Sequence, residues 1–118
     1  MYRYKANVIK VVDGDTIDLE IELGFNILIR ERVRLYGIDA PETRTKDKKE
    51  KAKGLKTKRY VENAIGGEEI EIETKKDKGK FGRYLATIHY DRGDGISTNL
   101  NAELITSNLA KEYYGGKR

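Results

Sequence analysis

The chain has 118 residues, no cysteine, one histidine and no tryptophan, which excludes disulfides, thiolate metal sites and cysteine nucleophiles. A chain of this length has room for one hydrophobic core, so a single domain over residues 1–118 is expected, with 115–118 as a flexible tail. No apolar run is longer than three residues, which excludes a membrane-spanning helix. No leader sequence is visible, which favours a cytoplasmic protein, or a secreted one whose leader was removed.

Positive charge is concentrated in one stretch of the chain. Charged residues make up 37% of the sequence, yet the net charge is only +4. Residues 43–59 hold nine Lys or Arg and two acidic residues, a local net charge of +7. Such a focused basic stretch fits a polyanionic partner such as nucleic acid, and the alternative interpretation is a solvated helix face.

The first third of the chain has the alternation of β-strands. Residues 2–12 predict a first strand, and the acidic Asp13-Gly14-Asp15 predicts a turn. Residues 16–23, TIDLEIEL, alternate strictly between apolar and acidic side chains and give the clearest strand. A third strand is expected over 27–38, and Pro41 breaks the extended pattern because it removes a backbone donor.

The rest of the chain predicts a helix, two strands and a second helix. The first helix is expected over 47–65, stopped by Gly66-Gly67, and its lysine-rich front half is also compatible with a loop. Strands follow over 68–74 and 83–90 with a turn at 75–82 between them, and a short helix follows over 100–107 with Asn108 in a left-handed conformation after it. If these two strands pair, His89 lies roughly opposite Glu73, and a structural contact is the favoured role for this histidine.

The order β-β-β-α-β-β-α predicts a mainly β protein with two helices. Three strands, a helix and two more strands is the order of the OB-fold, a five-stranded Greek-key barrel. Such barrels often bind nucleic acids or oligosaccharides, so this order agrees with the basic stretch.

Three short segments concentrate acids and arginines. The first is VDGDT at 12–16, where two carboxylates flank a glycine and would attract a hard cation such as calcium, although an ordinary β-turn is the alternative. The second is RVRLYGIDAPE at 32–42, whose alternative reading is a surface salt bridge before a turn. The third is KFGR at 80–83, which is also compatible with a hairpin turn and a solvated arginine.

Together and in this order, these segments resemble the staphylococcal nuclease (thermonuclease) family. The matching stretches are VIKVVDGDTIDL, VRLYGIDAPET and KGKFGRYLATI, with a looser match at NAELITSNLAKEY, so the resemblance extends from about Val8 to Tyr114. It implies an OB-fold domain that uses Ca²⁺ to hydrolyse phosphodiester bonds of DNA and RNA with little sequence specificity. The resemblance also implies that single strands are the preferred substrates, that duplex DNA is cut more weakly and that the products end in 3′-phosphates.

The resemblance also implies roles for individual residues. Asp15, Asp39 and the backbone carbonyl of Ala40 are expected to ligate Ca²⁺, with Asp13 beside the metal ligands. Arg34 and Arg83 would bind phosphate, and Glu42 would orient or deprotonate the attacking water. Those roles agree with general chemistry, because a divalent cation and guanidinium groups offset phosphodiester charge and a carboxylate can hold a water for in-line attack.

Substrate contacts are expected from a second group of residues: Lys80, Phe81, Tyr114, Lys48 and Lys49. Phe81 departs from the tyrosine usual in the family, and Tyr113 is the rival to Tyr114 for the tyrosine that lies against the nucleotide. No membrane or protein partner is expected, and a monomer is favoured. The alternative function is a non-catalytic OB-fold module that binds nucleic acid without cleaving it.

Overall fold

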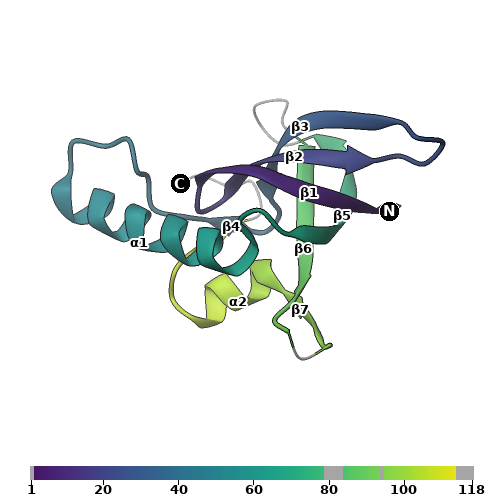
Figure 1. Cartoon of the computed structure of the whole chain (residues 1–118). Coiled ribbons are helices and arrows are strands. Elements are labelled where there is room, and N and C mark those ends of the chain that lie inside the picture. The colour runs from purple at the N-terminus through teal and green to yellow at the C-terminus, as the bar shows by residue number, and fades with distance from the viewer. Residues whose placement is uncertain (1, 79–83, 94, 114–118) are drawn as a thin grey trace.

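A five-stranded β-barrel forms the centre of the molecule (Figure 1). The computed structural model describes residues 2–78, 84–93 and 95–113. The elements are β1 (Tyr2–Asp13), β2 (Thr16–Glu22), β3 (Leu28–Leu35), β4 (Ile38–Asp39), α1 (Lys48–Ile65), β5 (Glu69–Lys78), β6 (Tyr84–Asp91), β7 (Ser97–Asn99), α2 (Leu100–Thr106) and β8 (Lys111–Glu112). The strand order β3-β2-β1-β5-β6 closes through a parallel pairing of β3 with β6, and β7 extends the sheet beyond β6.

The barrel and the two helices confirm the predicted fold class. Strict alternation on β2 directs Ile17, Leu19 and Ile21 into the core, where they are almost fully buried. Side chains from α1, Val61 and Ile65, join this core, as does Leu104 of α2. The barrel strands and helices therefore follow the predicted order, and the short strands β4, β7 and β8 are additions to it.

Two strand boundaries differ from the prediction. The expected third strand over 27–38 is two strands, because Gly37 takes a φ of 80° and turns the chain between β3 and β4. β4 then pairs with β8 in a small separate sheet, which places Asp39 opposite Lys111. β5 continues to Lys78 across the segment expected to be a turn from residue 75, after a register shift beyond Thr74.

Helix α1 begins and ends close to the predicted positions. The Asp47 side chain caps its start by accepting hydrogen bonds from the backbone N–H groups of Lys49 (3.0 Å) and Glu50 (3.4 Å). At the other end, the Gly66 N–H donates to the Glu62 carbonyl, and Gly67 has a φ of 71°. The lysine-rich front half is therefore helical. Among the described residues, no helix is long and apolar enough to cross a membrane.

Asn101 fastens α2 to the barrel. Its side-chain amide donates to the carbonyls of Tyr36 (2.8 Å) and Ala86 (3.1 Å), and its Oδ1 accepts from the Ile88 N–H (3.1 Å). Asn108 follows this helix with a φ of 57°, as predicted for its left-handed position. Because one of these bonds holds the Tyr36 carbonyl, just before Gly37, it also helps to fix the position of β4.

The predicted contact between His89 and Glu73 is present. His89 Nε2 lies 2.8 Å from Glu73 Oε1, although His89 is in register with Glu71, so the contact is diagonal across β5 and β6. The hydrogen bond with His89 lowers the pKa of Glu73 below its ordinary value of 4.5, and the charge of Arg3 adds to that effect.

We expect Glu73 to make folding stability depend on pH in the acid range. A carboxyl whose pKa is lower in the folded state stabilises the fold above its unfolded pKa, and that contribution is lost as the pH falls through the folded value. The melting temperature of wild type should therefore exceed that of Glu73→Gln at pH 6, and the difference should shrink at pH 3. His89→Phe should reduce the difference at pH 6. An equal difference at both pH values would contradict this assignment.

Candidate functional site

Asp15 lies in the turn between β1 and β2, at one end of the barrel. It is 8% exposed, and its Oδ2 accepts a hydrogen bond from the Ala40 N–H at 3.0 Å. Its Oδ1 accepts from the Thr16 hydroxyl at 3.2 Å. The backbone of the same turn is tied to β3, because the Asp15 carbonyl accepts from the Leu35 N–H at 2.8 Å. The turn is thus hydrogen-bonded to the end of β3, next to Arg34, and to Ala40, next to Asp39.

Arg34 connects the two predicted metal-binding carboxylates. The pairing of β2 with β3 places it opposite Thr16, next to the turn. It is 9% exposed, and its Nη2 lies 3.2 Å from Asp39 Oδ1 and 3.7 Å from Asp15 Oδ2. The Tyr113 ring lies against the guanidinium, with Arg34 Cζ 5.4 Å from the ring centroid. Asp15, Arg34 and Asp39 therefore form one cluster, called here the acid–arginine cluster.

The charge in this cluster is only partly balanced. Burial raises the pKa of Asp15 above its ordinary value of 3.8. The Ala40 N–H, the Arg34 charge and the Thr16 hydroxyl oppose that rise, whereas the Asp39 charge adds to it. A raised pKa means that the surroundings favour the neutral acid, so a further cation next to Asp15 would stabilise its charged form.

The donor atoms in the cluster suit a hard cation. Asp15 and Asp39 offer carboxylate oxygens, and the chain after Asp39 offers backbone carbonyls, the oxygen ligands that Ca²⁺ prefers. Within the described ranges, no three His, Cys, Asp or Glu side chains form a metal-binding group. A calcium ion here would therefore depend on two carboxylates, on carbonyls such as that of Ala40, and on water.

Glu42 is exposed and follows the cluster by three residues. The next residue, Thr43, donates a hydrogen bond from its hydroxyl to Asp13 Oδ1. Asp13 is half-buried at the end of β1, so it lies beside the cluster and links the turn to the chain around Glu42. The sequence predicted Asp13 as a neighbour of the site but did not identify its partner.

Helix α1 supports the two segments that carry the site. Thr57 is buried and donates a hydrogen bond to the Leu109 carbonyl at 2.7 Å. A Cβ on Gly14 would overlap the Thr57 methyl group and would lie 3.1 Å from the Ala40 Cβ. The turn of Asp15 and the chain at Ala40 thus pack directly on α1. Sequence reasoning missed this support, since a threonine in a helix carries no signal of a distant partner.

The predicted substrate-binding residues are only partly described. Lys48 and Lys49 are exposed on the first turn of α1, which extends beyond the barrel (Figure 1). Lys80, Phe81, Arg83 and Tyr114 lie outside the described residues. Tyr113, the rival to Tyr114, contacts Arg34, and its N–H donates to the Gly37 carbonyl at 2.9 Å.

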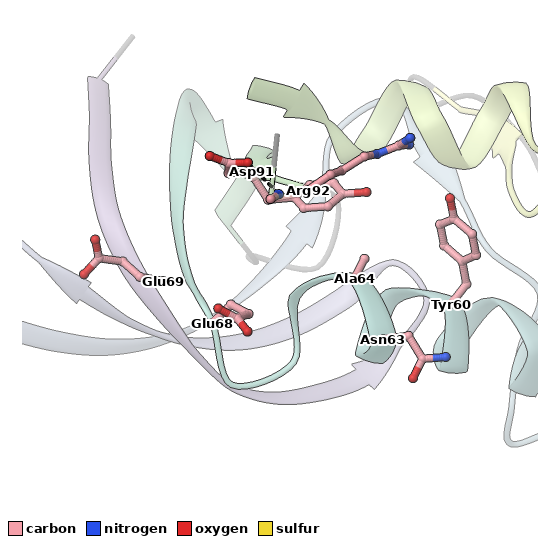
Figure 2. A pocket seen from close by; sticks show the side chains of 9 residues that line it. Tyr60, Asn63, Ala64, Glu68, Glu69, Asp91 and Arg92 are labelled. Atoms are coloured by element: carbon pink, nitrogen blue, oxygen red, sulfur yellow. Dashed lines mark hydrogen bonds between the residues drawn. The ribbon is translucent and has the colours of Figure 1, made fainter. Parts of the chain in front are cut away.

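A separate hollow of about 670 Å³ lies between the end of α1, the start of β5 and the end of β6 (Figure 2). Its walls include Glu68, Glu69 and Asp91. Its one lining arginine, Arg92, is paired with buried Glu103, which also accepts a hydrogen bond from the Tyr90 hydroxyl at 2.5 Å. Three carboxylates in the wall repel phosphate, so this hollow does not suit a nucleic-acid backbone.

Comparisons with known proteins identify a family for this chain. The family described as "Staphylococcal nuclease homologue" matches residues 32–118, which include Arg34, Asp39 and Glu42. "Micrococcal nuclease" of Shigella flexneri is 30% identical over 97% of this chain and 62% of its own length. "Endonuclease YhcR" of Bacillus subtilis is 29% identical over 94% of this chain but only 9% of its own length. An uncharacterized protein of Methanocaldococcus jannaschii is 30% identical over 93% of this chain and 59% of its own length.

The chain spans about 60% of the length of two of these relatives, 62% of the Shigella flexneri protein and 59% of the Methanocaldococcus jannaschii protein. The family match covers most of the chain, and the predicted barrel and the acid–arginine cluster are both present. The chain belongs to the staphylococcal nuclease homologue family.

Proposed function

We propose that this chain is a calcium-dependent endonuclease that hydrolyses phosphodiester bonds of DNA and RNA with little sequence specificity. Membership of the family and the nuclease names of two relatives support a nuclease function. The observation that carries the proposal is the buried Arg34, which lies between the carboxylates of Asp15 and Asp39. An ordinary surface salt bridge would not bury an arginine together with one acid, here Asp15, beside a second acid that is only partly exposed.

In this proposal, Asp15, Asp39 and the Ala40 carbonyl would hold Ca²⁺, which when bound would offset the negative charge of the phosphodiester. Arg34 donates to the phosphate and stabilises the charge that grows in the transition state, and Arg83 would contribute a second guanidinium. Glu42 holds the attacking water and accepts its proton. As the water oxygen bonds to phosphorus, the bond between phosphorus and the 5′-oxygen breaks, the 5′-oxygen takes a proton from solvent, and the other product ends in a 3′-phosphate.

Water attack explains why the chain needs no nucleophilic side chain. The carboxylate of Glu42 is exposed, so a water and a polynucleotide can both reach it. Arg34 reaches phosphate while its other face rests on Tyr113, which limits the orientations of the guanidinium. The arrangement therefore supports a mechanism in which positioning of the reactants and electrostatic stabilisation of the transition state account for most of the rate acceleration.

The test uses circular single-stranded DNA and RNA, because a circle has no ends for an exonuclease. With calcium, the purified chain should linearise and then fragment the circle, and the new ends should carry 3′-phosphates. Duplex circles should be cut more slowly. Binding without cleavage in excess calcium would contradict the enzyme and support the binding-module alternative.

We expect the first turns of α1 to contribute non-specific affinity for the substrate. Lys48, Lys49, Lys51 and Lys53 are all exposed in this part of the helix. Each phosphate contact to a single strand steepens the fall of log affinity with log salt by about 0.7. Changing Lys48 and Lys49 to Gln should therefore flatten that slope, measured by titration with single-stranded DNA in chelator, where no cleavage occurs.

The matched control changes Lys5 and Lys10 on β1 to Gln. Both are exposed, and their removal lowers the net charge by the same amount. If α1 forms part of the binding surface, this control should leave the salt slope close to that of wild type. Equal slopes for the two double variants would show that only overall charge matters and would contradict the role of α1.

A further inference from the structure

Gly54 lies in the interior of α1, where glycine is one of the poorest helix formers. The residues before and after it on the helix include good helix formers, Lys53 and Leu55. Gly54 is buried and takes no left-handed conformation that would require glycine. Its place in the helix therefore needs an explanation from packing.

The explanation is the chain around Glu42, which lies directly on Gly54. A Cβ at this position would come within 2.5 Å of the Glu42 carbonyl oxygen and 2.7 Å of the Pro41 carbonyl oxygen. Real Cβ atoms do not approach backbone atoms this closely, so any side chain here must displace the chain at 41–42. Backbone carbonyls cannot rotate away as the end of a long side chain can.

A second contact holds the same segment. The Thr43 hydroxyl donates to Asp13 Oδ1, and Asp13 is the last residue of β1, two residues before Asp15. The chain around Glu42 is thus held both by α1 and by Asp13. The Glu42 side chain is itself exposed, so these contacts of its neighbours are what fix the point from which it extends.

We infer that Gly54 and Thr43 are positioning residues for Glu42: the absent side chain of Gly54 and the hydroxyl of Thr43 set the place of the carboxylate that activates water. This inference rests on the proposed function. A shift of about 1 Å in a positioned group lowers rates by up to about 100-fold, so small displacements of the 41–43 backbone should be visible in kcat.

The experiment measures kcat and KM for single-stranded DNA cleavage in excess calcium by Gly54→Ala, with circular dichroism and a thermal melt to check folding. We expect kcat to fall at least tenfold while KM stays within about twofold. Ala52→Ser is the control, because it adds one atom at an exposed position of the same helix. It should cleave like wild type.

Combination with Glu42→Ala separates positioning from a general weakening of the fold. If Gly54 acts through Glu42, Gly54→Ala should cause no further loss in the Glu42→Ala background. A full additional loss there, or wild-type kcat for Gly54→Ala alone, would overturn the role of Gly54 while the proposed function stands. A wild-type chain that does not cleave would overturn the proposed function and this inference with it.

Variants of Thr43 test the same positioning of Glu42 if Gly54→Ala does not fold. Thr43→Val keeps the shape of the side chain and removes the donor to Asp13, so it should lower kcat and should lose this effect in the Glu42→Ala background. Thr43→Ser retains the hydroxyl and should restore most of the rate. Equal rates for Thr43→Val and Thr43→Ser would overturn the role of the hydrogen bond.

Discussion

Replacing Arg34 with Ala should lower kcat for single-stranded DNA cleavage by at least about 100-fold, the usual scale for losing a donor to a developing oxyanion. The guanidinium is the only described cation in contact with both Asp15 and Asp39. Its loss removes a phosphate ligand and leaves two carboxylates close together with less compensating charge. The rate is measured by single-turnover cleavage in excess calcium, with the melting temperature recorded beside it.

Arg34→Lys is the matched variant, because it keeps the positive charge and loses the planar fork. If Arg34 binds phosphate through two N–H groups, Lys should restore stability better than it restores the rate. Ala should cost stability as well, because an uncompensated buried charge destabilises the fold by about 3 kcal/mol. A rate near that of wild type in the Ala variant would contradict the assignment.

Asp15→Asn should separate calcium binding from folding. Because burial raises the pKa of Asp15, its charge is unfavourable in the folded state at neutral pH. A neutral amide of the same shape should leave the melting temperature in chelator equal to that of wild type or higher. Calcium affinity should fall by about tenfold or more, since the charge of the ligands sets the affinity of such sites.

The two readouts for Asp15→Asn are the melting temperature in chelator and the rise in melting temperature as calcium is added. Wild type should gain stability with calcium through mass action, and the variant should gain much less. Asp18→Asn is the control, because Asp18 is paired with Arg32 across β2 and β3 and not with Arg34 of the cluster. An equal calcium response in wild type and Asp15→Asn would contradict a metal site at Asp15.

Local patterns predicted most of the fold. Strict alternation defined β2, the Gly66-Gly67 pair marked the end of α1, and Asp47 marked its start within one residue. Strands of two or three residues were not predicted, because β4 and β8 are too short to show alternation and exist only through pairing with each other. The charged end of β5 was misassigned, since its pairing with β6 decides its conformation.

The candidate site residues were predicted from three segments of acids and arginines that together resemble one family, but the contacts that support those residues were not predicted. Asp15 is far from Arg34 and Asp39 in the sequence, and the three meet because the β1–β2 turn, β3 and β4 converge at one end of the barrel. The contacts that hold them come from Thr57, Gly54 and Thr43, which are ordinary residues until the fold brings partners to them. Of these three residues, Gly54 alone could have indicated a close packing contact from the sequence, because glycine is uncommon inside a helix.

The most direct test of the central claim is cleavage of single-stranded DNA by wild type and Glu42→Gln, with calcium and with chelator. Glutamine keeps the size of the side chain and removes the base. The account predicts rapid cleavage by wild type in calcium, none in chelator, and a loss of at least about 100-fold in the variant with DNA binding retained. Equal cleavage by wild type and variant, or cleavage that persists in chelator, would contradict it.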